Sequence, residues 1–109
     1  MNQQIYERLL GVARARSYTT YGDISPLVGL NMEEPNDRNE MSKLLEKIAR
    51  HEQQAGRPML TAVVIRADKN LPGDGFFDIA SEFGRFNGKD RLRFWIDALN
   101  EVHEHWQPR

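Results

Sequence analysis

Two hydroxyl side chains at the start of an expected helix, Thr20 and Tyr21, have the chemistry to hold a phosphate group. A threonine oxygen accepts one of the unpaired N–H groups of a first helical turn, and the N-terminus of a helix favours phosphate contacts. Tyr21 can equally pack over the preceding helix with its hydroxyl in water, because a tyrosine is partly apolar. The sequence leaves both alternatives open for Tyr21.

A basic stripe follows on the expected helix 37–54. Its members recur at spacings of four, four and three residues, which places them on one helical face: Asn39, Lys43, Lys47 and Arg50. Such a stripe can bind phosphates, but it is more often a solvated face. Glu40 and Glu46 are interleaved with it, and Glu46 with Arg50 suits an ion pair that supports the helix.

Other patterns resemble chemical motifs but are weaker evidence for a functional site. The run His103-Glu104-His105 is a weak metal candidate, because residues two apart on a helix point to different sides. The loop Pro72-Gly73-Asp74-Gly75 has no following Lys-Ser or Lys-Thr and therefore suits a turn better than a phosphate cradle. No spacing recommends Asp74, Glu82 or a histidine as an acid or base. We expect no catalysis, no cofactor and no metal.

The composition is that of one ordinary globular domain. The 109 residues contain 39% hydrophobic and 28% charged residues and no cysteine, which excludes a disulfide, a thiolate metal site and a cysteine nucleophile. No long apolar stretch or signal-peptide pattern is present, so we expect a cytoplasmic protein without membrane contact. The net charge of −1 means that nucleic acid would need a locally segregated basic face, oligomerisation or a partner.

The spacing of apolar residues predicts the helices that position these side chains. We expect a helix over 3–16 with a core face at Ile5, Leu9, Val12 and Ala13. Thr19 or Thr20 then caps a short second helix that begins near Tyr21 and stops at Gly29. The third helix, 37–54, has Asn36 or Asp37 as its N-cap and an apolar stripe made of Met41, Leu44, Leu45 and Ile48.

The second half of the chain predicts a small wing and a last helix. Met59 to Ile65 is an apolar run typical of a buried strand, and 66–75 contains turn residues. Phe76 and Phe77 begin either a second strand of the wing or a short helix through Phe83. The last helix, 89–106, has a single apolar face made of Leu92, Trp95, Ile96, Leu99, Val102 and Trp106. The aromatic residues of this half are expected in the core rather than in a base-stacking platform.

The segment Tyr18-Thr19-Thr20-Tyr21-Gly22-Asp23-Ile24, followed by Leu27-Val28-Gly29, resembles the DNA-binding domain of alkylguanine-DNA alkyltransferases and alkyltransferase-like proteins. The resemblance covers residues 3–66. It implies a helix-turn-helix whose third helix enters the minor groove. It also implies that Tyr21 presses on a phosphate and that Arg38 fills the gap left by a flipped nucleotide.

The chain departs from this family at the alkyl acceptor. Where the family has Pro-Cys-His-Arg, this chain has Pro58-Met59-Leu60-Thr61. A methionine thioether cannot supply the thiolate that attacks an alkyl group, so alkyl transfer is excluded. Small residues of the family's third helix are also replaced, and the loop before it is acidic at Glu33-Glu34. The C-terminal part, 76–109, has no counterpart in the family.

We therefore expect one α/β, mostly α, winged helix-turn-helix-like domain over residues 1–109, with three N-terminal helices, a small β-wing and a C-terminal helix. The expected function is non-enzymatic binding of duplex DNA, with the third helix in a groove and the wing on the adjacent strand. The predicted nucleic-acid contacts are Thr20, Tyr21, Arg38, Asn39, Ser42, Lys43, Lys47, Arg66 and Lys69.

The alternative is a protein–protein interaction module, an adaptor or inhibitor, on the same scaffold. It would use the acidic loop Glu33-Glu34 and the C-terminal aromatic helix, with Trp106 at a partner contact or a homodimer seam. The near-neutral charge favours this alternative, and salt dependence of binding separates the two functions.

Overall fold

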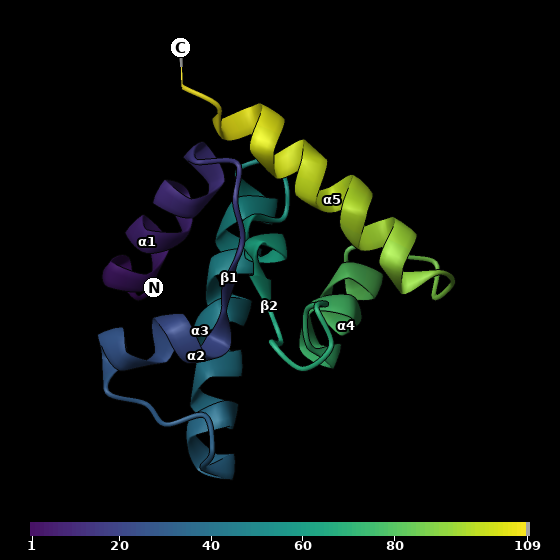
Figure 1. The fold of residues 1–109 in the computed structure, drawn as a ribbon. Coiled ribbons are helices and arrows are strands. Elements are labelled where there is room, and N and C mark those ends of the chain that lie inside the picture. Colours follow the sequence, from purple (N-terminus) through teal and green to yellow (C-terminus); the bar gives the residue numbers. More distant parts are fainter. Residues whose placement is uncertain (109) are drawn as a thin grey trace.

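Five α-helices and a two-stranded parallel sheet make up residues 1–108 of the computed structural model, which are the residues that the structure describes (Figure 1). The helices are α1 (Gln3–Arg14), α2 (Tyr21–Ile24), α3 (Pro35–Gln54), α4 (Asp74–Glu82) and α5 (Arg91–Trp106). Two 3₁₀ helices, η1 (Ser25–Val28) and η2 (Leu60–Val63), and two strands, β1 (Thr19–Thr20) and β2 (Val64–Ile65), complete the chain. The mostly helical class expected from the sequence is confirmed.

The first two helices begin at the side-chain caps that short polar residues provide. The Asn2 side chain accepts a hydrogen bond from the Ile5 N–H at 2.9 Å, and α1 ends two residues earlier than predicted, at Arg14. The Thr20 hydroxyl accepts from the Asp23 N–H at 3.1 Å, which confirms the predicted cap of α2. A left-handed Gly29, with φ of 69°, ends the second helical segment as predicted.

The third helix begins earlier than the sequence indicated. Pro35 occupies its first turn, where a missing N–H costs nothing, and Glu34 precedes it without a side-chain cap. The predicted caps Asn36 and Asp37 are therefore wrong. Asp37 instead accepts a hydrogen bond from the Asn31 N–H at 2.9 Å and so fastens the preceding loop to the helix.

The apolar run 59–65 is buried throughout, but it is not the strand that we predicted. Leu60–Val63 forms η2, and only Val64 and Ile65 are strand, paired in parallel with Thr19 and Thr20. A short buried apolar run has no periodicity that separates the two conformations. The second wing strand is also not formed, because Phe76 and Phe77 lie in α4, and antiparallel pairing is limited to one bridge between Arg66 and Leu71.

The last helix closes the core. Figure 1 shows α5 running across the molecule, with α1 beside its C-terminal half and α4 near its start. It begins at Arg91, two residues later than predicted, with Asp90 as its cap. The Trp95 indole N–H donates to the Ala62 carbonyl at 2.8 Å and fixes α5 to η2. Leu92 and Ile96 of its predicted apolar face are exposed.

The buried apolar side chains form one cluster contributed by α1, α3, η2, α4 and α5. Four phenylalanines of the second half pack on one another at ring-centroid distances between 4.9 and 6.4 Å: Phe76, Phe77, Phe86 and Phe94. Phe76 and Phe77 are buried in the core as predicted, and Phe83, Phe86 and Phe94 are partly buried against it. None of the described helices is both long and apolar enough to cross a bilayer.

Candidate functional site

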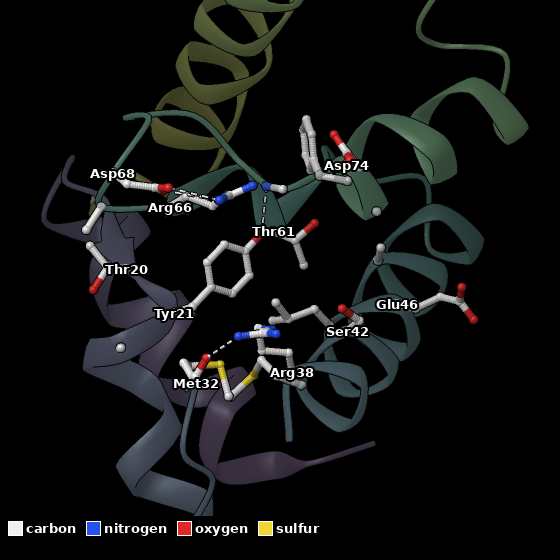
Figure 2. A pocket seen from close by; sticks show the side chains of 18 of the residues that line it. Thr20, Tyr21, Met32, Arg38, Ser42, Glu46, Thr61, Arg66, Asp68 and Asp74 are labelled. Atoms are coloured by element: carbon white, nitrogen blue, oxygen red, sulfur yellow. Dashed lines mark hydrogen bonds and ion pairs between the residues drawn. The ribbon is translucent and has the colours of Figure 1, made fainter. Parts of the chain in front are cut away.

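A cleft of about 1220 Å³ opens between α2, the loop before α3, α3 itself and the first turn of α4 (Figure 2). Tyr21 and the segment from Gly73 to Gly75 at the start of α4 touch each other and form one side, and Arg38 and Ser42 of α3 line another. Met41, Leu45 and other apolar side chains of α3 and α4 form its floor. We call this space the cleft, and the part bounded by Tyr21, Thr61 and Gly73–Gly75 its inner end.

Tyr21 joins two segments that are far apart in the sequence. Its phenol oxygen accepts a hydrogen bond from the Gly73 N–H at 2.9 Å, so its own O–H remains a donor. The approach is close, because a Cβ added to Gly73 would lie 3.1 Å from that oxygen. Burial raises the pKa of Tyr21 above its ordinary value, and the hydroxyl is therefore protonated at neutral pH. The predicted phosphate contact stays a prediction.

Thr61 is a cleft residue that the sequence did not single out as a site. It is 5% exposed, and it lies between the Tyr21 ring and the start of α4 in the close view (Figure 2). Its hydroxyl makes no hydrogen bond with another described residue and is open to the cleft, since it is not among the fully buried polar groups. The only available signal was a single hydroxyl within the apolar run 59–65.

Two arginines line the cleft, and they differ in whether a carboxylate pairs with their charge. Arg38 donates from Nη1 to the Met32 carbonyl at 3.1 Å, and within residues 1–108 no carboxylate forms an ion pair with it. Arg66 is held by Asp68 through two hydrogen bonds, at 3.1 and 2.9 Å. The hydrogen bond from Arg66 lowers the pKa of Asp68 below its ordinary value. The Arg66 charge is thus largely compensated, whereas that of Arg38 is not.

Carboxylates surround the rest of the cleft. Glu33, Glu46, Asp68 and Asp74 all line it. Asp74 accepts a hydrogen bond from Arg91 at 2.7 Å, and this contact lowers the pKa of its carboxyl group. The surface at the cleft is therefore not a concentrated positive patch.

The structure divides the predicted nucleic-acid residues into two groups. Those that line the cleft are Thr20, Tyr21, Arg38, Ser42 and Arg66. Those that are exposed outside its lining are Asn39, Lys43, Lys47 and Lys69. Lys43 forms an ion pair with Glu40 at 3.7 Å. Arg50 of the basic stripe forms ion pairs with Glu82 of α4 and with Glu46.

Trp106 is half-buried rather than an exposed anchor. The guanidinium groups of Arg14 and Arg57 each lie 5.8 Å from its ring centre, which is within cation–π range. Its indole N–H is buried without a partner among the described residues. His103, part of the weak metal candidate, is buried with its Nε2 2.8 Å from the Ser17 carbonyl oxygen.

Comparison with protein-family models, with curated proteins and with solved structures finds no match to this chain. Its function must therefore be argued from the cleft and the surface around it.

Proposed function

We propose that this protein is a non-enzymatic nucleic-acid-binding protein of winged-helix-like architecture whose ligand is duplex DNA. One observation carries the proposal. Five of the nine residues predicted to contact nucleic acid come together at one cleft from α2, α3 and the segment after β2. Polar groups from separate segments that converge in this way are what a binding site requires, whereas residues that only cover a surface have no reason to meet.

The resemblance to alkyltransferase DNA-binding domains supports the same conclusion for the first half of the chain. Tyr21 and Arg38, the two positions to which it assigns DNA contacts, both lie at the cleft. Arg38 retains an uncompensated charge there and can reach a phosphate or a base. Met59 stands in the position of the acceptor cysteine, which is why binding is proposed without alkyl transfer.

The remaining cations set the expected strength of binding. Lys47 and Lys69 form no ion pair within residues 1–108, Arg38 bonds only to a carbonyl, and Lys43 has one exposed ion pair. Three to four phosphate contacts correspond to a slope of about −3 in a plot of log affinity against log salt. Affinity should then fall roughly 60-fold between 50 and 200 mM salt, which is a modest dependence for a DNA-binding protein.

The test is fluorescence anisotropy of labelled duplex and single-stranded DNA at both salt concentrations. Lys43→Glu combined with Lys47→Glu should abolish duplex binding, because it turns two attractive contacts into repulsive ones. Arg8→Glu combined with Lys89→Glu is the matched control, since both residues are exposed, lie on other segments and change the net charge equally. Equal binding by the two double variants would contradict the proposal.

A second candidate function, a protein–protein interaction module, is favoured by an exposed apolar patch. Tyr18, Leu92 and Ile96 are 54%, 53% and 39% exposed. The Tyr18 ring meets Trp95 edge-on at a centroid distance of 6.2 Å, which brings β1 and α5 together at this surface. An apolar interface would bind a partner, or a second copy in a homodimer, with little response to salt. Sedimentation at increasing concentration tests the homodimer.

A further inference from the structure

The inner end of the cleft presents several hydrogen-bond donors that are not in use. The Tyr21 hydroxyl accepts from Gly73 and has its proton free to donate. The N–H groups of Asp74 and Gly75 have no acceptor within α4, whereas that of Phe76 donates to the Gly73 carbonyl at 3.1 Å, and Gly73 supplies no side-chain cap. The position of a Cβ on Gly75 meets no atom within 4 Å, so the backbone there faces open space. These donors favour an oxygen acceptor in that space.

The Thr61 hydroxyl provides a second and independent observation. Thr61 is 5% exposed, its carbonyl accepts from the Val64 N–H, and its hydroxyl forms no hydrogen bond within residues 1–108. The Trp106 indole N–H is the one fully buried side-chain polar group without a partner in this range, so the Thr61 hydroxyl is open to the cleft and available to a ligand. A ligand oxygen at the inner end would provide its missing partner.

The floor of the cleft indicates that the main part of such a ligand is apolar. Met41, Leu45, Ala49, Phe76 and Ile79 line it with carbon atoms from α3 and α4. These side chains are between 1% and 8% exposed, so an apolar ring or chain would pack on the carbon atoms that they present and release a small amount of water. A fully hydrated ion or sugar would gain nothing from this surface.

At the inner end of the cleft, as distinct from the exposed part where Arg38 can reach a phosphate, charge disfavours ligands of either sign. Glu33 opposes an anion, whereas Glu46 is paired with Arg50, and the removal of an anion from water adds a cost. Arg38 and the positive end of α4 oppose a cation at the inner end, while Asp68 and Asp74 are already paired with arginines. An uncharged molecule avoids both penalties.

We propose that the inner end of the cleft binds a small uncharged molecule with an apolar body and one carbonyl oxygen, of which an aromatic carboxamide is the simplest example. The oxygen has two lone pairs and accepts from two of these donors, the Thr61 and Tyr21 hydroxyls, while the body lies on the apolar floor. This site does not rest on the nucleic-acid proposal, because it needs no phosphate contact.

Three probes of one shape test the charge preference. Benzamide, benzoate and benzamidine are each titrated to about 10 mM, a range suited to ligands of so few atoms, while backbone amide signals are followed by NMR. Benzamide should shift the signals of Thr61 and Gly73–Gly75 and bind at least about tenfold more tightly than either charged probe. Equal or tighter binding of a charged probe, or no binding of benzamide, would overturn the proposal.

Thr61→Val tests the hydroxyl, because valine keeps the shape and removes the oxygen. Benzamide affinity should fall about fivefold, the usual effect of one hydrogen bond. The variant should melt close to the temperature of the unchanged protein, since the hydroxyl has no partner within residues 1–108 and is open to the cleft. Thr19→Val, at a buried threonine of β1 outside the cleft, should leave benzamide affinity unchanged. Loss of affinity in both variants, or in neither, would refute the role of Thr61. Benzamide binding and DNA binding are measured separately, so either proposal can fail alone.

Discussion

Replacement of Arg57 by methionine should destabilise this protein more than the loss of an ordinary surface ion pair does. Glu52 is 0% exposed, and its carboxylate accepts hydrogen bonds from the Tyr6 hydroxyl at 3.0 Å and from Arg57 Nε at 2.6 Å. The hydrogen bond to Glu52 raises the pKa of Arg57 above its ordinary value. Arg57→Met keeps most of the apolar stem but leaves the buried carboxylate without its cation.

The magnitude follows from how far water can replace the lost group. Removal of one partner from a fully buried pair costs about 3–5 kcal/mol. The Arg57 side chain is 28% exposed, so water can reach part of the vacated site, which reduces the loss to about 2 kcal/mol. Loss of the cation–π contact with Trp106 adds about 0.5–1 kcal/mol. The total of about 3 kcal/mol corresponds to a decrease in Tm of about 12 °C for a chain of this size.

Urea denaturation at neutral pH and thermal melting followed by circular dichroism measure this loss. Arg93→Met is the control, because it breaks an exposed ion pair to Asp97, with a separation of 3.3 Å, and should cost at most about 0.5 kcal/mol. A loss of less than about 1 kcal/mol for Arg57→Met would show that the Glu52 carboxylate is solvated, and the buried-pair reasoning would be wrong.

Three smaller predictions concern the cleft. Thr20→Ala should lower the free energy of unfolding by about 1 kcal/mol in urea denaturation, and Thr20→Ser should not, because serine also caps the helix. Gly73→Ala should lower the melting temperature because its Cβ would lie 3.1 Å from the Tyr21 oxygen, and the loss should shrink when it is combined with Tyr21→Phe. Arg91→Gln should raise the lowered pKa of Asp74 towards its ordinary value in an NMR titration of the carboxyl carbon, because the Arg91 hydrogen bond is the largest cause of the lowering. Since that pKa is lowered, the small stabilising effect of the ion pair is present at neutral pH and is lost as the pH falls through the pKa of Asp74.

Local signals in the sequence predicted the helices well where the chemistry is itself local. The cap at Thr20 and the stop at Gly29 depend on residues within one turn, and both were correct. The run 59–65 was correctly predicted to be buried but wrongly predicted to be a strand throughout. Its conformation is set by α1, α3 and α5 packing around it, and that information lies outside the segment.

The candidate site was only partly predictable for a similar reason. Tyr21 and Arg38 were found because the sequence around them resembles a known pattern. The contact between Tyr21 and Gly73 joins residues 52 apart, and no periodicity anticipates it. Thr61 was missed because a threonine in an apolar run has no local feature that shows whether its hydroxyl will be paired. The carboxylates at the cleft also became apparent only when the segments were brought together.

The arrangement of charge explains why the two proposed ligands respond to different conditions. Lys43 and Lys47 lie on the exposed face of α3 outside the cleft, where salt screens their attraction for phosphate. The donors at the inner end, Tyr21 and Thr61, act through hydrogen bonds over a short range and carry no net charge, so added salt should leave benzamide affinity nearly unchanged. Nucleic-acid affinity that falls with salt, beside benzamide affinity that does not, would therefore show that phosphate is held by charge and benzamide by hydrogen bonds and apolar contact.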